Sequence, residues 1–397
     1  TVVGDEAGTA ITTGDNNVLV GYASGDAITT QSNITAVGNT ALTANTSGQR
    51  GTAVGSAALA GNTTGDYNTA VGFTALQANT TASNNTAVGY ASLSANTTGA
   101  NNVALGSLAL DANTTGGSNT ALGQASMTTL TTASYNTAVG LNSGLLLTTG
   151  ADNTLIGVSA GTTLTTGTLN VAVGRNALGG GAATNRNVAI GNNTLQSVSA
   201  ASSVDSYNVA IGYSTGGSVT TGVRNTLIGG LAGDALTTAA DNTAVGYAAL
   251  GANTTGHSNV AVGMSALDAN TDADHNTAIG DHALSSNTTA HNNTAVGADA
   301  LLANTTGTEN VAVGQVALAS NTTGNYNTAL GRASLNANTT ASYNTAVGYR
   351  ALDVNTTGAN NVAIGFTAVS GNTTGGELVG IGNGALLTNT TGGFNVA

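Results

Sequence analysis

The stretch Asn242–Gly256 reads NTAVGYAALGANTTG, and near copies of it run through the whole chain. The glycine that ends the NTAVG motif recurs from Gly4 to Gly382 at intervals of 17 residues, with one interval of 21, which gives 23 copies. A short, fixed period with so few insertions is typical of a solenoid. The sequence therefore predicts one repeated coil and no other kind of domain.

The single irregular interval runs from Gly191 to Gly212 and indicates a four-residue insertion within residues 192–207. Composition changes nowhere else along the chain. We expect residues 1–397 to form one solenoid array of 23 coils, cut from a longer chain.

We number the positions of the repeat from the Asn of NTAVG as position 1 to position 17. Positions 1–5 are rich in β-branched residues and too short for a helix, whose mean length is about 11–12 residues. The ANTTG tail at positions 11–15 has the composition of a turn. Each copy is predicted to be a strand-turn-strand coil, and stacking in parallel at about 4.8 Å per coil would give a rod roughly 105 Å long. The predicted fold class is an all-β parallel β-solenoid.

Stacking places each side chain over its counterpart in the next coil. The Asn columns at positions 1 and 12 predict amide ladders, and the Gly columns at positions 5 and 15 indicate places where no Cβ is tolerated. All ten Tyr and three Phe occupy positions 6 and 17, and we expect them to pack along the strand edges. The structural core residues predicted with most support are Leu267, Leu284, Leu318, Gly263, Gly280 and Gly314.

Two kinds of coil differ at positions 9 and 12. Most coils carry Leu at position 9 and Asn at position 12, as in Leu267 and Asn270, whereas six carry Gly at position 9 and an apolar residue at position 12, as in Gly233 and Leu236. In four of these six coils, position 3 also carries the larger residue Val or Leu in place of the usual Ala. Because close-packed interiors conserve volume, we infer that positions 3, 9 and 12 border one shared core space.

Composition excludes several functions. The chain has a net charge of −12, no Cys and no Pro, and its six Lys and Arg residues cannot form a basic track for nucleic acid. No apolar run approaches the roughly 20 residues of a membrane span, so we expect no membrane contact in this segment. The acidic residues are scattered, five of them at position 10, and no Ser-His-carboxylate set has an evident spacing. We expect neither an enzyme nor a bound cofactor.

One histidine cluster is a metal candidate. His257, Asp274 and His291 occupy position 16 of three successive coils, which places them about 4.8 Å apart. Imidazole and carboxylate in one row are ligands for Zn²⁺ or Ni²⁺. The alternative is a polar outer corner at which His, Asp, Ser, Gly and Ala interchange, and this is the preferred interpretation, so no metal site is predicted.

The Asn-Thr-Thr triplets match the N-glycosylation acceptor, for example at Asn62, Asn79 and Asn96, but they suit the turn equally well. The rows of Thr also suggest ice binding as a function. Adjacent Thr columns at positions 13 and 14 cannot both face outward from an extended strand, however, which counts against that function.

The strand itself predicts an oligomer. Side chains alternate, so the Ala at position 3 and the Val, Ile or Leu at position 4 put apolar groups on opposite faces. A strand that is apolar on both faces is usually covered on both. A 17-residue coil encloses one interior only, so we expect the second face to meet another copy of the chain in a homotrimer.

The motifs NVAVG, at Asn170–Gly174 and Asn259–Gly263, and NVAIG, at Asn187–Gly191, resemble the head repeats of YadA-like trimeric autotransporter adhesins. Similar Asn-Thr-Ala-Val-Gly arrays occur in repetitive fibre proteins of bacteriophages and bacterial surfaces. The resemblance implies a left-handed β-roll of three chains. Relative to the adhesins, the period here is longer, and ANTTG replaces their Ser-Ala-Gly run.

Together these features predict the shaft or head of an extracellular fibre on a virion or a bacterial surface, such as a phage tail or capsid fibre. Its partner would be itself, with a cell-surface receptor or glycan bound through a tip outside this segment. Two alternatives remain open: the passenger head of a bacterial trimeric autotransporter adhesin, and a self-polymerising extracellular filament.

Overall fold

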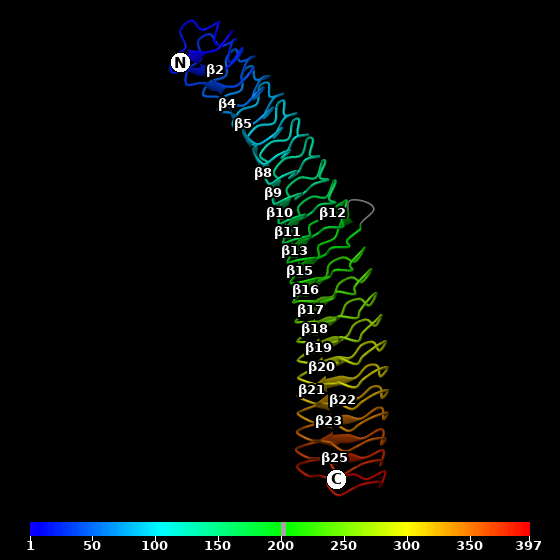
Figure 1. Cartoon of the computed structure of the whole chain (residues 1–397). Helices are drawn as coiled ribbons and strands as arrows, with labels where there is room; N and C mark the ends of the chain where they lie inside the picture. The colour runs from blue at the N-terminus through cyan, green and yellow to red at the C-terminus, as the bar shows by residue number, and fades with distance from the viewer. Residues whose placement is uncertain (200–203) are drawn as a thin grey trace. The chain divides into compact units, whose positions relative to one another are not determined.

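A computed structural model describes residues 1–199 and 204–397, and these parts of the chain contain β-strands and turns but no helix (Figure 1). The chain divides into two compact units, Thr1–Asp205 and Ser206–Ala397. Each unit is a parallel β-solenoid. That the two units form one uninterrupted array stays a prediction.

The strands of unit 1 follow one another at intervals set by the repeat. They are β1 (Val2–Val3), β2 (Val18–Val20), β3 (Thr35–Val37), β4 (Thr52–Val54), β5 (Thr69–Val71), β6 (Thr86–Val88), β7 (Val103–Leu105), β8 (Thr120–Leu122), β9 (Thr137–Val139), β10 (Thr154–Ile156), β11 (Val171–Val173), β12 (Thr184–Asn185), β13 (Val188–Ile190) and β14 (Val204–Asp205).

The strands of unit 2 occupy positions 2–4 of their coils without exception. They are β15 (Val209–Ile211), β16 (Thr226–Ile228), β17 (Thr243–Val245), β18 (Val260–Val262), β19 (Thr277–Ile279), β20 (Thr294–Val296), β21 (Val311–Val313), β22 (Thr328–Leu330), β23 (Thr345–Val347), β24 (Val362–Ile364) and β25 (Val379–Ile381).

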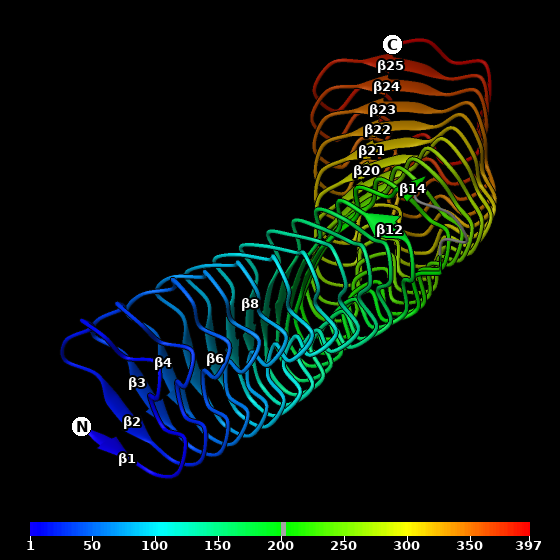
Figure 2. The same cartoon turned by 90° about the horizontal axis from the view of Figure 1, so that it is seen from above.

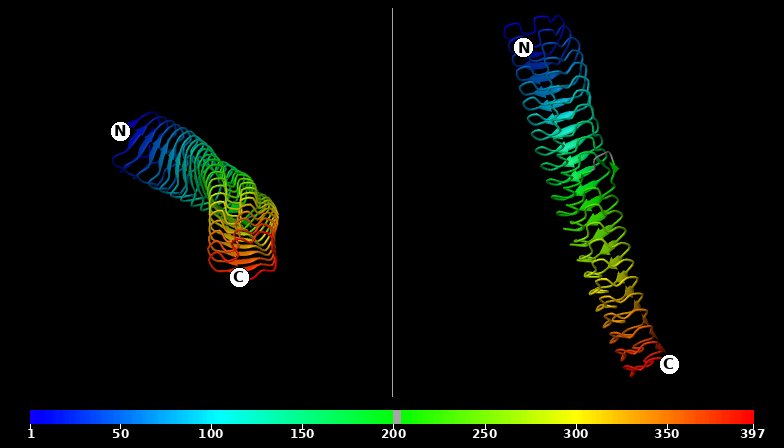
Figure 3. Two further views of the ribbon diagram at one scale, coloured as in Figure 1. Left: turned by 90° about the horizontal axis from the view of Figure 1, so that it is seen from below. Right: turned by 90° about the vertical axis from the view of Figure 1, so that its right-hand side faces the viewer.

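Neighbouring strands pair in parallel with a shift of one repeat. Between β17 and β18, for example, Thr243 pairs with Val260 and Val245 with Val262. Within each unit the strands lie one over another on the same side of the coil, and each coil encloses one interior (Figures 2 and 3). The predicted parallel stack of 17-residue coils is confirmed.

Outside the two coils that contain β12 and β14, the coil differs from the prediction in having one strand instead of two. In the coil that begins at Asn242, Ala248 and Leu250 have left-handed φ angles of 53° and 57°, and Ser258 has 58°. Left-handed residues cannot extend a strand, so the chain turns at positions 7 and 9 and again at position 17. Bonds between coils continue outside the strand, for example from the Leu250 N–H to the Ala266 carbonyl at 3.0 Å.

The core of each coil is built from positions 1, 3, 8, 9, 12 and 15. Ala244 and Leu250 are fully buried, whereas Val245 between them in sequence is partly exposed. Burying one Leu side chain contributes roughly 1.5–3 kcal/mol, so the Leu column is the main apolar contribution of each coil. Leu267, Leu284 and Leu318 are all fully buried, and Gly263, Gly280 and Gly314 end strands β18, β19 and β21.

The shared core space at positions 3, 9 and 12 is confirmed. A Cβ added to Gly233 would lie 2.6 Å from Cδ1 of Leu236 and 2.9 Å from Cδ2 of Leu227. The same pattern holds at Gly161, where Leu164 and Leu155 occupy the space at 2.9 and 2.8 Å. An apolar side chain at position 12, with its larger neighbour at position 3, thus fills the volume that Leu at position 9 fills elsewhere.

Buried asparagines satisfy one another between coils. At position 12, Nδ2 of Asn270 donates to Oδ1 of Asn253 at 2.9 Å and to the Ala273 carbonyl at 3.0 Å. At position 1, Nδ2 of Asn259 donates to the same Ala273 carbonyl at 2.8 Å, while its Oδ1 accepts the Asn276 N–H at 2.9 Å. One carbonyl therefore accepts both amides, which uses both of its lone pairs. The predicted amide ladder is confirmed at position 12. It is confirmed in part at position 1, where the side chains also bond to main chain and shorter ladders run from Asn119 to Asn187 and from Asn208 to Asn242.

These bonds bear on the glycosylation sites. Asn62, Asn79 and Asn96 are at most 2% exposed, and Nδ2 of each donates to the asparagine of the preceding coil. Glycosylation needs that nitrogen to be accessible. The folded coil is thus incompatible with it at these residues.

The prediction for the two Gly columns is confirmed at position 5 and holds only in part at position 15. The φ of Gly229 at position 5 is 132°, and an added Cβ would lie 2.4 Å from the Gly246 carbonyl oxygen of the next coil. At position 15, an added Cβ on Gly256 would lie 2.3 Å from the Ala273 carbonyl oxygen. Position 15 does not need a left-handed φ, however, and six coils carry Ala there: Ala82, Ala133, Ala239, Ala273, Ala290 and Ala341.

The insertion predicted within residues 192–207 includes residues 200–203, which lie outside the described residues. In the described part of this coil, β14 pairs in parallel with β12 of the preceding coil: Thr184 pairs with Val204 and Asn185 with Asp205. Arg186 forms an ion pair with Asp205 beside it.

Candidate functional site

One repeated surface is the outward face of the strands, formed by positions 2 and 4; we call it the strand face. Its position-4 side chains are Val, Ile or Leu in every coil, and several are more than a third exposed, such as Leu105 at 46% and Ile279 at 39%. Position 2 is Thr or Val. The strand face therefore carries no charge, and it repeats at every coil of both units (Figure 3).

Aromatic columns flank the strand face at positions 6 and 17. Tyr326 and Tyr343 stack with ring centroids 5.1 Å apart, Tyr349 and Phe366 at 5.3 Å, and Phe73 and Tyr90 at 5.8 Å. Most of these rings remain about half exposed. They pack on one another along the column, as expected for edge packing, but they cover the strand edges only in part.

The candidate metal residues His257, Asp274 and His291 form a column and do not converge on a common point. The N–H of Ala240 donates to Nδ1 of His257 at 2.9 Å, that of His257 to Oδ1 of Asp274 at 2.6 Å, and that of Asp274 to Nδ1 of His291 at 2.9 Å. Among the described residues no group of three or more His, Cys, Asp and Glu is arranged to hold a metal. The Nδ1 lone pairs of His257 and His291 already accept main-chain hydrogen bonds.

Position 16 thus has a structural role that sequence reasoning missed. Its side chain accepts the main-chain N–H of position 16 in the preceding coil, as Ser83 does for Asp66 at 3.0 Å and Ser342 for Asn325 at 2.9 Å. Asp, Ser, Asn and His share an acceptor atom close to the main chain. That common feature was the available signal for the polar residues at this corner; other coils carry Ala, Gly or Val there, as at Ala100, Gly117 and Val223, and have no side-chain acceptor at this position.

At two of the position-10 aspartates, the surroundings disfavour the charged carboxylate. Burial raises the pKa of Asp234 and Asp268 above the ordinary aspartate value, and the negative charge of Asp268 raises that of Asp234 further. The opposite holds for Asp241, because a hydrogen bond from Arg224 lowers its pKa. Nε of Arg224 lies 2.6 Å from Oδ1 of Asp241.

We expect Asp268→Asn to stabilise its coil at neutral pH and Asp241→Asn to destabilise its own. A raised pKa means that folding favours the protonated carboxyl, so stability is lost as pH rises through the folded-state pKa; a lowered pKa means the reverse. Hydrogen–deuterium exchange of the two coils checks this, with slower exchange for Asp268→Asn and faster exchange for Asp241→Asn. Both differences should disappear at a pH low enough to protonate every carboxyl. Equal exchange rates at neutral pH would contradict the assignment.

No helix in the described parts of the chain could cross a lipid bilayer. The sequence matches no known protein family, and no curated protein is similar to it.

Proposed function

We propose that this chain is a structural segment, shaft or head, of an extracellular fibre in which three copies pack through their strand faces. The observation that carries the proposal is the uncharged strand face, with partly exposed Val, Ile or Leu at position 4 of every coil. Extended apolar surfaces of this kind mark interaction sites in soluble proteins.

A second copy of the chain is the partner that fits this face. A partner must present apolar groups at the same interval, about 4.8 Å, over many coils. Another copy does so because it has the same repeat, and most soluble oligomers are homo-oligomers. The number of chains, three, and a left-handed coil follow from the resemblance to trimeric adhesin heads. Such a rod would hold an adhesive tip away from the virion or cell.

The test places charges on the strand face. The triple variant Ile279→Glu, Val296→Glu and Val313→Glu alters position 4 in three successive coils. Burying like charges in an interface costs several kcal/mol, so the apparent dissociation constant of the trimer should rise at least about 10-fold in sedimentation equilibrium. The matched control, Thr289→Glu, Thr306→Glu and Thr323→Glu, places the same charges at position 14 of the same coils, where the side chains are also exposed.

A trimeric wild type that only the position-4 variant dissociates supports the proposal. A wild type that is monomeric at micromolar concentration would overturn it. A dimer that the position-4 variant dissociates would retain the strand face as the interface but overturn the three-chain assembly. Equal effects of the two variants would show that net charge, and not the strand face, controls association.

A further inference from the structure

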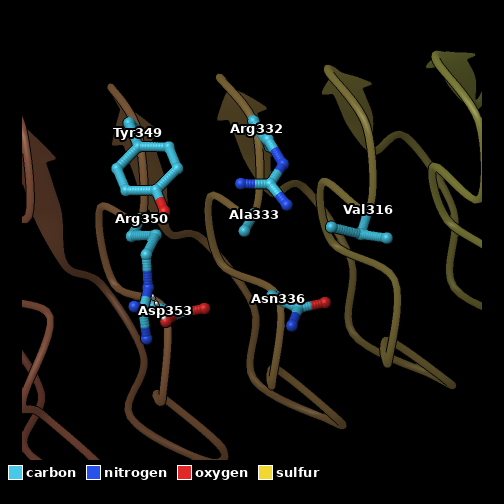
Figure 4. A pocket seen from close by; sticks show the side chains of 7 residues that line it. All are labelled: Val316, Arg332, Ala333, Asn336, Tyr349, Arg350 and Asp353. Atoms are coloured by element: carbon cyan, nitrogen blue, oxygen red, sulfur yellow. Dashed lines mark hydrogen bonds and ion pairs between the residues drawn. The ribbon is translucent and has the colours of Figure 1, made fainter.

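A polar pocket of about 290 Å³ opens on unit 2, beside the strand face (Figure 4). Its lining comes from positions 6, 7 and 10 of three successive coils: Val316, Arg332, Ala333, Asn336, Tyr349, Arg350 and Asp353. These positions follow strands β21, β22 and β23 in their coils. The pocket is therefore distinct from the face proposed for self-association.

The aromatic side of the pocket is fixed by stacking. The ring of Tyr349 stacks on Phe366 at 5.3 Å, and Cζ of Arg332 lies 5.8 Å from the centroid of the same ring. Nε of Arg332 also donates to Gln315 at 3.3 Å. A guanidinium held against an aromatic ring keeps its remaining N–H groups available to a ligand.

The opposite side is fixed by an ion pair. Nε of Arg350 donates to Oδ2 of Asp353 at 2.6 Å, and Asp353 is only 7% exposed. This contact raises the pKa of Arg350, which stays charged. Asp353 accepts from one of the five N–H groups of Arg350, and the side chain of Tyr349 is a second hydrogen-bond partner, so the remaining N–H groups are available to a ligand. The charged groups are thus held in place before any ligand binds, which lowers the entropy cost of binding.

The charge of the pocket is opposite to that of the chain. Two of the six basic residues line it together with one carboxylate, for a local charge of +1 on a chain of −12. Figure 4 shows the Arg332 guanidinium beside the Tyr349 ring and the Arg350 guanidinium beside Asp353. Each is a cationic group suited to a carboxylate or a sulfate. The remaining lining offers hydrogen-bonding partners in Asn336 and Asp353, and apolar contacts in Val316 and Ala333.

We propose that this pocket binds one anionic sugar residue of a glycan. The guanidinium groups would hold its carboxylate or sulfate, Asn336 and Asp353 its hydroxyl groups, and Val316 and Ala333 its C–H face. The volume lies near the lower end of small-molecule sites, which suits one sugar residue better than a larger ligand.

Saturation-transfer difference NMR on the full chain tests the proposal with methyl β-glucuronide, methyl β-glucoside, glucose 6-sulfate and acetate. The glucuronide and the glucoside differ only in the carboxylate. We expect saturable binding of the glucuronide, at least about 10-fold weaker binding of the glucoside and of acetate, and loss of glucuronide binding by about 10-fold or more in Arg332→Gln and in Arg350→Gln. Binding of the sulfate in place of the glucuronide would support the proposal and identify the anion.

The matched control is Arg175→Gln. Arg175 also occupies position 6 and is exposed, but Val158 and Asn192 flank it in that column, with no aromatic ring. This variant should bind like the wild type. The proposal fails if neither anionic sugar binds saturably, if the glucoside or acetate binds as well as the glucuronide, or if Arg175→Gln loses as much binding as Arg332→Gln. Sedimentation of the same variants reports self-association separately, so either proposal can fail without the other.

Discussion

Gly229→Ala is expected to destabilise its coil by about 2–6 kcal/mol, whereas Gly230→Ala, one residue later, should change stability by less than about 1 kcal/mol. The φ of Gly229 is 132°, which an L-residue rarely adopts, and the added Cβ would lie 2.4 Å from the Gly246 carbonyl oxygen. That oxygen belongs to main chain that is bonded on both sides. Strain and overpacking therefore add together.

Gly230 is the control because it shares the coil, the amino acid and the substitution. A Cβ at Gly230 would meet only Cδ2 of Tyr247, at 3.7 Å, an ordinary contact. Urea unfolding followed by circular dichroism, with hydrogen–deuterium exchange of residues 225–258 to locate the effect, measures the difference. Equal unfolding midpoints for the two variants would mean that the position-5 column does not need glycine.

The repeat period was sufficient to predict the parallel stack, its register and the buried position 3. It was sufficient because most coils repeat the same alternation, with Ala at position 3 inside and Val, Ile or Leu at position 4 outside, and a slip of one residue would reverse it. Some coils carry their large apolar side chain at position 9, as at Leu250, and others carry it at position 12, as at Leu236. This exchange also predicted that the two positions border the same core space. These features depend on side-chain volume and on the alternation of side chains along the strand, and both can be read from the types of residue in the sequence.

The left-handed backbone at positions 7, 9 and 17 could not be predicted. Leu250 has a φ of 57° and Tyr67 of 56°, yet neither Leu nor Tyr favours that region. The hydrogen bonds of the neighbouring coils impose the conformation, and no local signal reports it. The pocket was missed for a related reason, because Arg332 and Arg350 are 18 residues apart and become neighbours only when position 6 of one coil lies beside position 7 of the next.

The coils with Asn at position 12 and those with an apolar residue there are arranged in blocks. The amide ladder at position 12 explains this arrangement. One continuous ladder runs from Asn45 to Asn113 and a second from Asn253 to Asn389. Every coil with an apolar residue at position 12 lies outside them, before Asn45 or between Asn113 and Asn253. A block of such coils interrupts the ladder once, whatever its length. Grouping them therefore preserves hydrogen bonds that scattered coils would lose.

The ladder makes the effect of exchanging the two coil types depend on where the exchange is made. Leu267→Gly alone should cost about 1–4 kcal/mol: the cavity costs about 2–5 kcal/mol, and glycine relieves about 1 kcal/mol of strain because Leu267 has a φ of 53°. The backbone contribution therefore favours the glycine. Adding Asn270→Leu should recover about 0.5–3 kcal/mol by refilling the shared space.

The matched exchange is Leu42→Gly with Asn45→Leu, in the first coil of the other ladder. Asn270 takes part in two amide bonds between coils, to Asn253 and from Asn287, whereas Asn45 takes part in one, from Asn62, because Ile28 stands before it; each of the two asparagines also donates to one main-chain carbonyl. The exchange at 42 and 45 therefore only shortens a ladder, while that at 267 and 270 interrupts one. The first double variant should be more stable than the second by about 0.5–1.5 kcal/mol, the net contribution of one hydrogen bond, in urea unfolding. Equal stability of the two double variants would contradict the ladder as the cause of the blocks, and a double variant no more stable than its Leu→Gly single would contradict the shared core.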